Sequence, residues 1–310
     1  MKKILAGVVF LLVLSMAGMM AYVHFNPEKV FASAQNAERK AAHLELKSIS
    51  VDNLDIAYLE GGTGDPLVLV HGFAADKDNW TRVAKFLTPH FRVIAPDLPG
   101  CGQSTKRMDL DYSLKGQAKW LHDFVTALGL STINLGGNSM GGAIAGVYAA
   151  TYGDQVKSLW LIDPAAVNFP EESDLQRMLK EGENPLIIKT PNDFNTLLNF
   201  VFYRRPYIPS SIVTMLGRHA VANKLMNEIV FKAIGNDPLR IDDLLKGSSI
   251  PTLVLWGDHD RVLNVSGAKV LCTKMADAKT VIMKDAGHAP MIERPRDAAT
   301  SFLAFHGMKI

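Results

Sequence analysis

The residues with the clearest chemical meaning lie in the segment Gly137-Asn138-Ser139-Met140-Gly141, which fits the pattern G-x-S-x-G. An apolar run, residues 133–135, precedes this motif, and a segment rich in small residues, 142–152, follows it. A strand, a sharp turn and a helix in this order hold a serine hydroxyl above the edge of a sheet, where it can act as a nucleophile. The two glycines let the strand and helix backbones approach each other at the turn. We therefore predict that Ser139 is a catalytic nucleophile.

A serine nucleophile needs a base within hydrogen-bond reach and an acid that orients the base. His288 follows the apolar run 280–283, and Asp260 follows the apolar run 251–256. Both residues would therefore lie beyond the carboxyl ends of strands, where open α/β sheets place their ligands. We predict that His288 is the base and Asp260 the acid, which gives the chain order serine, acid, histidine.

Two other carboxylates compete with Asp260. Asp258 lies in the same loop and is expected to cap the turn. Asp163 follows the apolar run 156–162, and a carboxylate at that strand end could also reach the histidine, although we favour a role in closing the strand. His259 neighbours the predicted acid and is expected to be a solvated loop residue.

The developing oxyanion of an acyl transfer needs backbone N–H donors. The N–H of Met140, directly after the nucleophile, is the first expected donor. The second is the N–H of Phe73, in a loop that follows the apolar run 67–70. Such donors contribute on the order of 3 kcal/mol each to transition-state stabilisation. His71, at the start of that loop, is expected to anchor the loop without titrating in catalysis.

Predicted strands alternate with predicted helices along most of the chain, which is typical of a mostly parallel sheet with helices on both faces. The predicted strands are residues 44–51, 54–59, 67–70, 91–95, 133–135, 156–162, 251–256 and 280–283. The predicted helices are residues 80–87, 114–128, 142–152, 270–275 and 296–305. Asp52-Asn53 is expected to form a hairpin turn between the first two strands.

The alternation stops between residues 165 and 247, where apolar residues recur at helical spacing and no good buried strand occurs. We predict a helical cap at 165–247, inserted into an α/β core made of residues 43–164 and 248–310. An aromatic and apolar stretch within the cap is expected to pack as ordinary helical core, to line an acyl pocket, or to do both. The predicted pocket residues are Phe194, Leu198 and Phe202.

Composition excludes several classes of function. The chain has 310 residues, 48% of them hydrophobic, which suffices for one large core with an insertion. Its net charge of +2, without a long block of like charge, gives no electrostatic footprint for nucleic-acid binding. The two cysteines, Cys101 and Cys272, form neither a disulfide framework nor a metal site. We expect no metal and no cofactor, and we expect a monomer.

The N-terminus stands apart from the rest of the chain. Lys2 and Lys3 precede residues 4–23, which carry no charge. A secretory apolar region usually runs about 7–15 residues, whereas a membrane-spanning helix needs about 20. We therefore predict a membrane anchor and helical stalk over residues 1–42, with the catalytic domain facing the periplasm or the outside. The alternative is an exported enzyme whose N-terminal segment is cleaved. Ala32-Ser33-Ala34 fits a cleavage signal, but it lies beyond Glu28 and Lys29, too far past the apolar run for a typical signal-peptide site.

The combination of these segments resembles the α/β-hydrolase superfamily from about residue 43 to the C-terminus. The segments that carry the resemblance are His71-Gly72-Phe73, Asp97-Leu98-Pro99-Gly100, 137–142, 256–260 and Gly287-His288. The N-terminal segment and the strings 137–142, 260–268 and 291–295 look more narrowly like bacterial family V lipases and the membrane-anchored monoacylglycerol lipases of animals. The resemblance implies an eight-stranded sheet with an inserted cap, and hydrolysis of acylglycerol or related lipid esters without a cofactor.

Two other functions stay open within this resemblance. Hydrolases that cleave carbon–carbon bonds in aromatic meta-cleavage products can share the same elbow and an intervening cap. Against them stand the N-terminal apolar segment and Ala289-Pro290 after His288, where that group usually has an aromatic residue. A non-catalytic, ligand-binding relative is disfavoured because the serine, acid and histidine positions are all filled.

Overall fold

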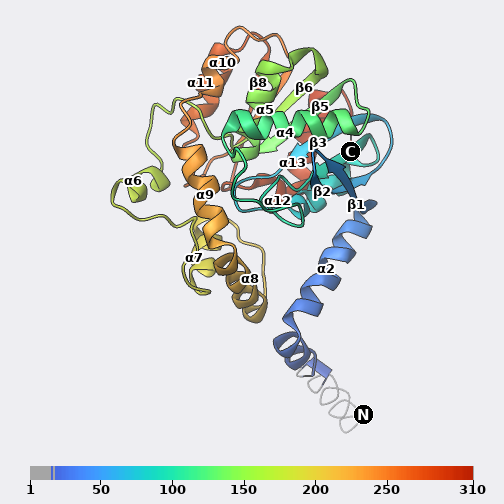
Figure 1. Ribbon diagram of the computed structural model, residues 1–310, viewed down its shortest axis with the longest axis vertical. Coiled ribbons are helices and arrows are strands. Elements are labelled where there is room, and N and C mark those ends of the chain that lie inside the picture. The colour runs from blue at the N-terminus through green and yellow to red at the C-terminus, as the bar shows by residue number, and fades with distance from the viewer. Residues whose placement is uncertain (1–14, 17, 310) are drawn as a thin grey trace, which may run out of the picture.

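The structure is a computed structural model that describes residues 15, 16 and 18–309. Figure 1 shows a sheet with its covering helices, a group of helices beside it, and an N-terminal helix that runs away from the sheet toward the N-terminus. The carboxyl ends of the central strands are the part of this fold that matters for the site.

Eight strands form one sheet in the order β1-β2-β4-β3-β5-β6-β7-β8. The strands are β1 (Leu44–Val51), β2 (Leu54–Gly61), β3 (Asp65–Val70), β4 (Phe91–Pro96), β5 (Ile133–Asn138), β6 (Val156–Ile162), β7 (Thr252–Gly257) and β8 (Ala278–Met283). β2 pairs antiparallel with both β1 and β4, and every other pairing is parallel. The predicted mostly parallel, eight-stranded α/β fold is therefore confirmed.

Helices cover both faces of the sheet and fill the segment between β6 and β7. In the core they are α3 (Thr81–Leu87), α4 (Leu114–Ala127), α5 (Met140–Thr151), α11 (Ser266–Lys274), α12 (Pro290–Glu293) and α13 (Pro295–Phe305), with short 3₁₀ helices η1 (Lys77–Trp80) and η2 (Gly153–Gln155). Between β6 and β7 they are α6 (Asp174–Lys180), α7 (Asp193–Val201), α8 (Ser210–Ala222), α9 (Lys224–Gly235) and α10 (Ile241–Leu244).

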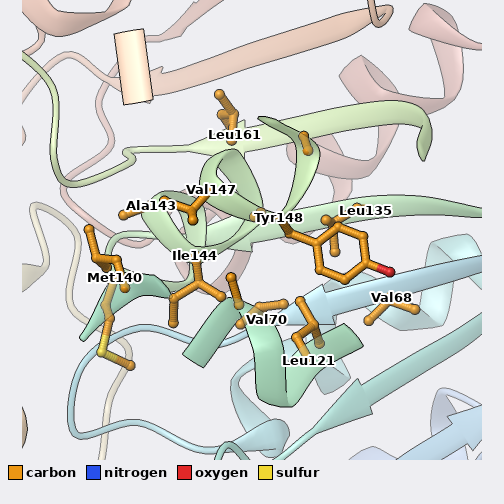
Figure 2. Packing of buried hydrophobic residues seen from close by; sticks show 14 of the residues in the cluster. Val68, Val70, Leu121, Leu135, Met140, Ala143, Ile144, Val147, Tyr148 and Leu161 are labelled. Atoms are coloured by element: carbon orange, nitrogen blue, oxygen red, sulfur yellow. The ribbon is translucent and has the colours of Figure 1, made fainter. Parts of the chain in front are cut away.

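The core has two parts, one on each face of the sheet, because successive side chains of a strand point to opposite faces. Val68 and Val70 of β3 belong to the part covered by α4 and α5, whereas Leu67 and Leu69 belong to the part covered by α3 and α13. Figure 2 shows the first part, in which side chains of the strands pack with side chains of α5. The strand residues are Val68, Val70, Leu135 and Leu161, and the α5 residues are Ile144, Val147 and Tyr148. This packing fixes α5 directly beneath the end of β5, where the G-x-S-x-G motif lies.

The observed elements differ from the predicted ones mainly at their ends. β5 continues to Asn138, beyond the predicted end at residue 135, because Gly136 and Gly137 carry no side chain that an apolar pattern could register. Consequently α5 starts at Met140, one residue after the predicted nucleophile. β3 begins at Asp65, two residues before the predicted start at residue 67. The predicted hairpin turn is present, and Asp52 and Asn53 have φ of 48° and 62°.

Residues 165–247 contain helices and loops only, as the sequence pattern predicts. We refer to this segment as the helical insertion. The division of the chain into an anchor, a two-part core and a cap stays a prediction.

The region of the predicted stalk is helical, as α2 (Pro27–Ala41), and this helix contacts both the core and the helical insertion. Its role as a stalk stays a prediction. Arg39 forms a hydrogen-bonded ion pair with Asp78, with Nε and Oδ1 2.6 Å apart. Glu28 lies 2.9 Å from His219 of α8. Most of the predicted anchor, residues 4–23, lies outside the described residues. Among the helices that the structure does describe, none combines the length and the apolar composition needed to cross a membrane.

Candidate active site

Ser139 occupies a strained turn between β5 and α5. Its φ of 56° and ψ of −119° are unusual for a residue with a side chain, and such strain concentrates at functional sites. The Ser139 N–H donates to the Ile162 carbonyl at 3.0 Å, and the Ser139 carbonyl accepts from the N–H groups of Ala143 and Ala165 at 3.0 and 2.9 Å. These bonds to β6, to α5 and to the residues after β6 hold the strained turn in place.

The two glycines of the motif are required by close backbone contacts. A Cβ at Gly137 would lie 2.2 Å from the carbonyl oxygen of Gly141, and a Cβ at Gly141 would lie 2.1 Å from the carbonyl oxygen of Val70. Both separations are far below van der Waals contact, so any larger residue would push α5 away from β5 and β3. The spacing of the motif is thus explained by the packing of strand against helix.

His288 and Asp260 contact each other directly. His288 Nδ1 lies 2.7 Å from Asp260 Oδ2, and the Asp260 side chain is completely buried. The other oxygen, Oδ1, accepts from the backbone N–H groups of Val262 and Leu263 at 2.8 and 3.0 Å. Because Asp260 accepts at Oδ2, the hydrogen-bond network assigns the proton of a neutral His288 to Nδ1. Nε2 is then the nitrogen that can accept a proton.

Asn138 links the serine turn to the histidine loop. Its Nδ2 donates to the carbonyl oxygens of Ile162, at 3.2 Å, and His288, at 3.1 Å. Asn138 is buried and immediately precedes Ser139. The sequence motif contains this residue at a position where any residue is allowed, so the motif gave no sign of its role.

The two competing carboxylates occupy different places. Asp258 Oδ1 accepts the Ala286 N–H at 3.3 Å and lies 2.6 Å from His259 Nδ1, so Asp258 supports the turn, as expected. Asp163 is fully buried, and its Oδ1 accepts the Gly257 N–H at 2.8 Å. Burial, together with the negative charge of Asp260, raises the pKa of Asp163 well above its usual range.

In the described part of the chain, Asp163, Asp260 and His288 form a group whose potential metal-ligating atoms all lie within 4.8 Å of one another. Two ligands of a tetrahedral ion with bonds of about 2 Å would be roughly 3.3 Å apart. His288 Nδ1 and Asp260 Oδ2 are only 2.7 Å apart, the separation of a hydrogen bond. The geometry is that of a proton-sharing group and does not fit an ion held by these two atoms.

The loop after β3 lies against the serine turn. A Cβ at Gly72 would be 3.3 Å from the Cβ of Ser139. Within the described residues, the backbone N–H groups of Phe73 and Met140, the two predicted oxyanion donors, make no hydrogen bond to another protein group. The Met140 N–H also belongs to the first turn of α5, where helix N–H groups lack an intrahelical acceptor.

His71 anchors this loop, as predicted. Nδ1 lies 2.8 Å from the Gly72 carbonyl oxygen, and Nε2 accepts the Leu98 N–H at 3.1 Å. Burial lowers the pKa of His71, so the ring stays neutral. Both ring nitrogens are therefore engaged by backbone groups, with the proton on Nδ1.

A buried ion pair that the sequence did not reveal supports the same loop. Lys77 Nζ lies 2.8 Å from Asp97 Oδ2, and both side chains are almost entirely buried. Asp97 also accepts the backbone N–H groups of Lys77 and Gln103, at 2.8 and 2.7 Å. Lys77 lies in a polar stretch that is typical of an exposed loop, so nothing in the sequence marks it as buried.

The predicted acyl-pocket residues lie on or next to α7. Leu198 is buried, Phe194 is partly buried, and Phe202 directly follows the helix. Phe202 packs against the core on the α3 and α13 face. Phe202 therefore has a packing role, and a substrate-binding role for the three residues stays a prediction.

The end of α7 is tied to the histidine loop. The His288 N–H donates to the Val201 carbonyl at 2.8 Å. Glu293 of α12 accepts the Gly287 N–H at 2.8 Å and the Arg204 N–H at 2.7 Å. Burial raises the pKa of Glu293. The sequence showed Glu293 only as part of a family string, without a role.

Comparisons with known proteins agree with this fold. A family described as "alpha/beta hydrolase fold" matches residues 65–295. Lipase 3 of Moraxella sp. (strain TA144) is 38% identical over 281 residues, which are 88% of each chain. The monoacylglycerol lipase abhd6-A of Xenopus laevis is 33% identical, over 86% of this chain and 84% of its own. The crystal structure of a membrane phospholipase A, a bacterial virulence factor, is 42% identical, with a TM-score of 0.89 over 99% of this chain and 98% of that one.

Proposed function

Since this chain belongs to the α/β-hydrolase family, we propose that Ser139, His288 and Asp260 form a catalytic triad that cleaves lipid esters through an acyl-enzyme. The chain is a carboxylic ester hydrolase, and the lipases that it resembles over most of its length support a lipid ester as the substrate. The observation that carries the proposed mechanism is the 2.7 Å contact between His288 Nδ1 and Asp260. This contact orients His288 so that Nε2 can act as a base.

In the proposed first step, the Ser139 hydroxyl attacks the ester carbonyl carbon while His288 Nε2 takes the hydroxyl proton. Asp260 stabilises the imidazolium that forms, without becoming protonated itself. The tetrahedral intermediate then collapses, the bond to the alcohol oxygen breaks, and His288 returns the proton to that oxygen. The products of this step are the free alcohol and an acyl group bound to Ser139.

The negative oxygen of the tetrahedral intermediate is proposed to lie between the N–H groups of Phe73 and Met140. Removal of one such donor typically costs about 3–4 kcal/mol in transition-state stabilisation. The N-terminus of α5 adds its positive dipole end to the same place. The Lys77–Asp97 ion pair and His71 support this arrangement by fixing the loop that carries Phe73.

In the second half of the reaction, His288 takes a proton from a water molecule, and the resulting hydroxide attacks the acyl-enzyme. The bond between the acyl carbon and the serine oxygen breaks, and His288 returns the proton to Ser139. A carboxylic acid is released. The cycle consumes one ester and one water and needs no cofactor.

Acylglycerols or related lipid esters are the proposed substrates, because relatives across most of the chain are named lipase, monoacylglycerol lipase and membrane phospholipase A. The last of these names also supports a location at a membrane. We extend this to an anchor at residues 4–23 with the catalytic domain on the periplasmic or outer side, and to a monomer. Phe194, Leu198 and Phe202 are proposed to contact the acyl chain.

The test compares wild type with S139A, using S301A as a control that removes a hydroxyl far from the motif. We expect S139A to lose about 10⁴-fold or more in kcat on p-nitrophenyl esters, with an unchanged circular dichroism spectrum. It should also lose labelling by a fluorophosphonate, while S301A keeps both. Ester turnover by S139A near the wild-type rate would reject Ser139 as the nucleophile.

The same assay tests the substrate class. Rates are measured on esters from acetate to palmitate, with an aromatic dienoate as a probe of carbon–carbon bond cleavage. A maximum at medium or long acyl chains supports the lipid ester. Turnover of the dienoate alone would instead assign the chain to the carbon–carbon bond hydrolases.

A further inference from the structure

Asp163 is placed beside the proposed triad by the order of the strands. It directly follows β6, and its N–H donates to the Leu255 carbonyl of neighbouring β7 at 2.9 Å. Its φ of 43° turns the chain sharply at this point. The Asp260 loop follows β7, so two carboxylates from adjacent strand ends enter the same buried space.

The hydrogen bonds of Asp163 account for only one of its two oxygens. Oδ1 accepts the Gly257 N–H at 2.8 Å. Oδ2 is buried, and among the described residues no donor reaches it. An oxygen of Asp163, an oxygen of Asp260 and a ring nitrogen of His288 lie within 4.8 Å of one another. An ionised Asp163 would therefore have one buried oxygen without a protein donor, which is costly in a protein interior.

The charged groups around Asp163 make ionisation still less favourable. Asp260 and His288 face it from the loops after β7 and β8, and the negative charge of Glu293 on α12 also acts on it. Two neighbouring buried carboxylates cannot both ionise without a large penalty, and one of them keeps a proton. Asp260 is the member with three donors: two backbone N–H groups and His288 Nδ1. Asp260 is therefore the member whose negative charge is stabilised by hydrogen bonds.

We propose that Asp163 is a positioning residue that remains protonated at neutral pH and donates its Oδ2 proton to the Asp260 carboxylate. This inference rests on the proposed function, because Asp260 is taken to be the acid of the triad. A carboxylate offers about four lone-pair sites, so Asp260 has room for a fourth donor. No proton is transferred during the reaction, and Asp163 acts only by holding Asp260.

The proton on Asp163 has a consequence for His288. If both carboxylates were ionised, their combined negative charge would stabilise the imidazolium form of His288 and weaken His288 as the base that accepts the Ser139 proton. A neutral Asp163 fixes the acid in place without adding charge to the base.

The experiment compares wild type, D163N and D163A in the pH dependence of kcat/KM on a p-nitrophenyl ester. The acid limb of that profile reports the pKa of His288. Asparagine is neutral, offers an N–H donor to Asp260 and an oxygen to the Gly257 N–H, and should restore function. We expect D163N to keep kcat/KM within about threefold of wild type and the acid limb within about 0.3 pH unit. We expect D163A to lose roughly ten- to hundredfold, because a hydrogen bond to a charged group is lost.

The position of the acid limb distinguishes a protonated Asp163 from an ionised one. If Asp163 were ionised, D163N would remove a negative charge close to His288 and move the acid limb to lower pH by about one unit or more. That shift would overturn the proposal. Equal kcat/KM for D163N and D163A would overturn it as well, since the donor would then have no effect.

An infrared measurement tests the proton without any substrate. We expect the difference spectrum between wild type and D163N at pH 7 to contain the C=O stretch of a protonated carboxylic acid. D260N supplies a second comparison in case D163N folds poorly. In D260N the hydrogen-bond partner of Asp163 is an amide instead of a carboxylate, so the C=O band of the protonated Asp163 should shift. A missing band overturns the proposal whether or not Ser139 is the nucleophile, and S139A tests the nucleophile separately.

Discussion

Replacing Asp260 with asparagine should invert the hydrogen bond that orients the catalytic base. The amide has one oxygen and one NH₂ group where the carboxylate had two oxygens. Oδ1 of Asp260 accepts two backbone N–H groups, so the amide oxygen of D260N must take that side. The NH₂ group then faces His288 Nδ1, which becomes an acceptor, and the ring proton moves to Nε2. In that tautomer His288 cannot accept the Ser139 proton.

The size of the effect follows from the same contacts. The productive tautomer returns only if the amide flips, which leaves the Val262 and Leu263 N–H groups without an acceptor. An unsatisfied buried donor costs about 1–3 kcal/mol, so the flip costs about 2–6 kcal/mol. At about 1.4 kcal/mol for each tenfold change in rate, kcat should fall roughly 30-fold to 20,000-fold. The fold should be retained, because the side chain keeps its shape.

The assay is kcat on a p-nitrophenyl ester at pH 8, with circular dichroism and urea denaturation as checks of folding. D258N is the matched control, since it makes the same change two residues away. Asp258 contacts His259 and the Ala286 N–H and does not contact His288. We expect D258N to stay within about threefold of wild type. A D260N enzyme that keeps more than about a tenth of the wild-type kcat would refute the tautomer argument.

Two further predictions concern the loop that carries Phe73. K77M should lower the free energy of unfolding by about 3 kcal/mol or more, because it leaves the buried Asp97 charge unpaired, and the double variant K77M/D97N should recover part of that loss. Urea denaturation of both single variants and the double variant measures this coupling, and additive losses would contradict it. The second prediction concerns His71, whose pKa is lowered from 6.5 by burial. Below pH 6.5 the His71 side chain of the unfolded protein therefore binds a proton that it does not bind in the folded protein. The free energy of unfolding should therefore decrease as pH falls from 6.5, by up to about 1.4 kcal/mol per pH unit. H71N should lack this contribution. Equal slopes of unfolding free energy against pH for wild type and H71N would reject the prediction.

The sequence predicted the sheet well because the central strands are covered on both faces and form continuous apolar runs. It failed at the end of β5, where Gly136 and Gly137 contribute backbone but no apolar side chain. The positions of Ser139, Asp260 and His288 relative to their elements were also predictable, because each lies at or just beyond the carboxyl end of a strand. The 2.7 Å contact between Asp260 and His288 is what the order of the strands would lead one to expect.

Contacts between distant segments could not be predicted in the same way. Lys77 and Asp97 form a buried pair only because the loop after β3 folds back over the end of β4, and polar residues in loops are ordinarily solvated. Asn138 and Glu293 act through backbone groups of other loops, which leave no pattern in a single sequence. The sequence did single out Asp163 as a possible acid, but its unsatisfied Oδ2 is visible only in the structure.

The bonds from the end of α7 to the histidine loop have a consequence for how substrate binding and catalysis depend on each other. Val201 accepts the N–H of His288 itself, and Glu293 joins the residue before His288 to Arg204. A displacement of the C-terminal end of α7 would therefore disturb His288. By thermodynamic reciprocity, any ligand that stabilises the insertion in its observed position also stabilises His288 in its productive orientation. An acyl chain bound against α7 would thus help to hold His288 in its productive orientation. The same coupling free energy would then contribute to the affinity for the acyl chain and to the population of correctly oriented His288.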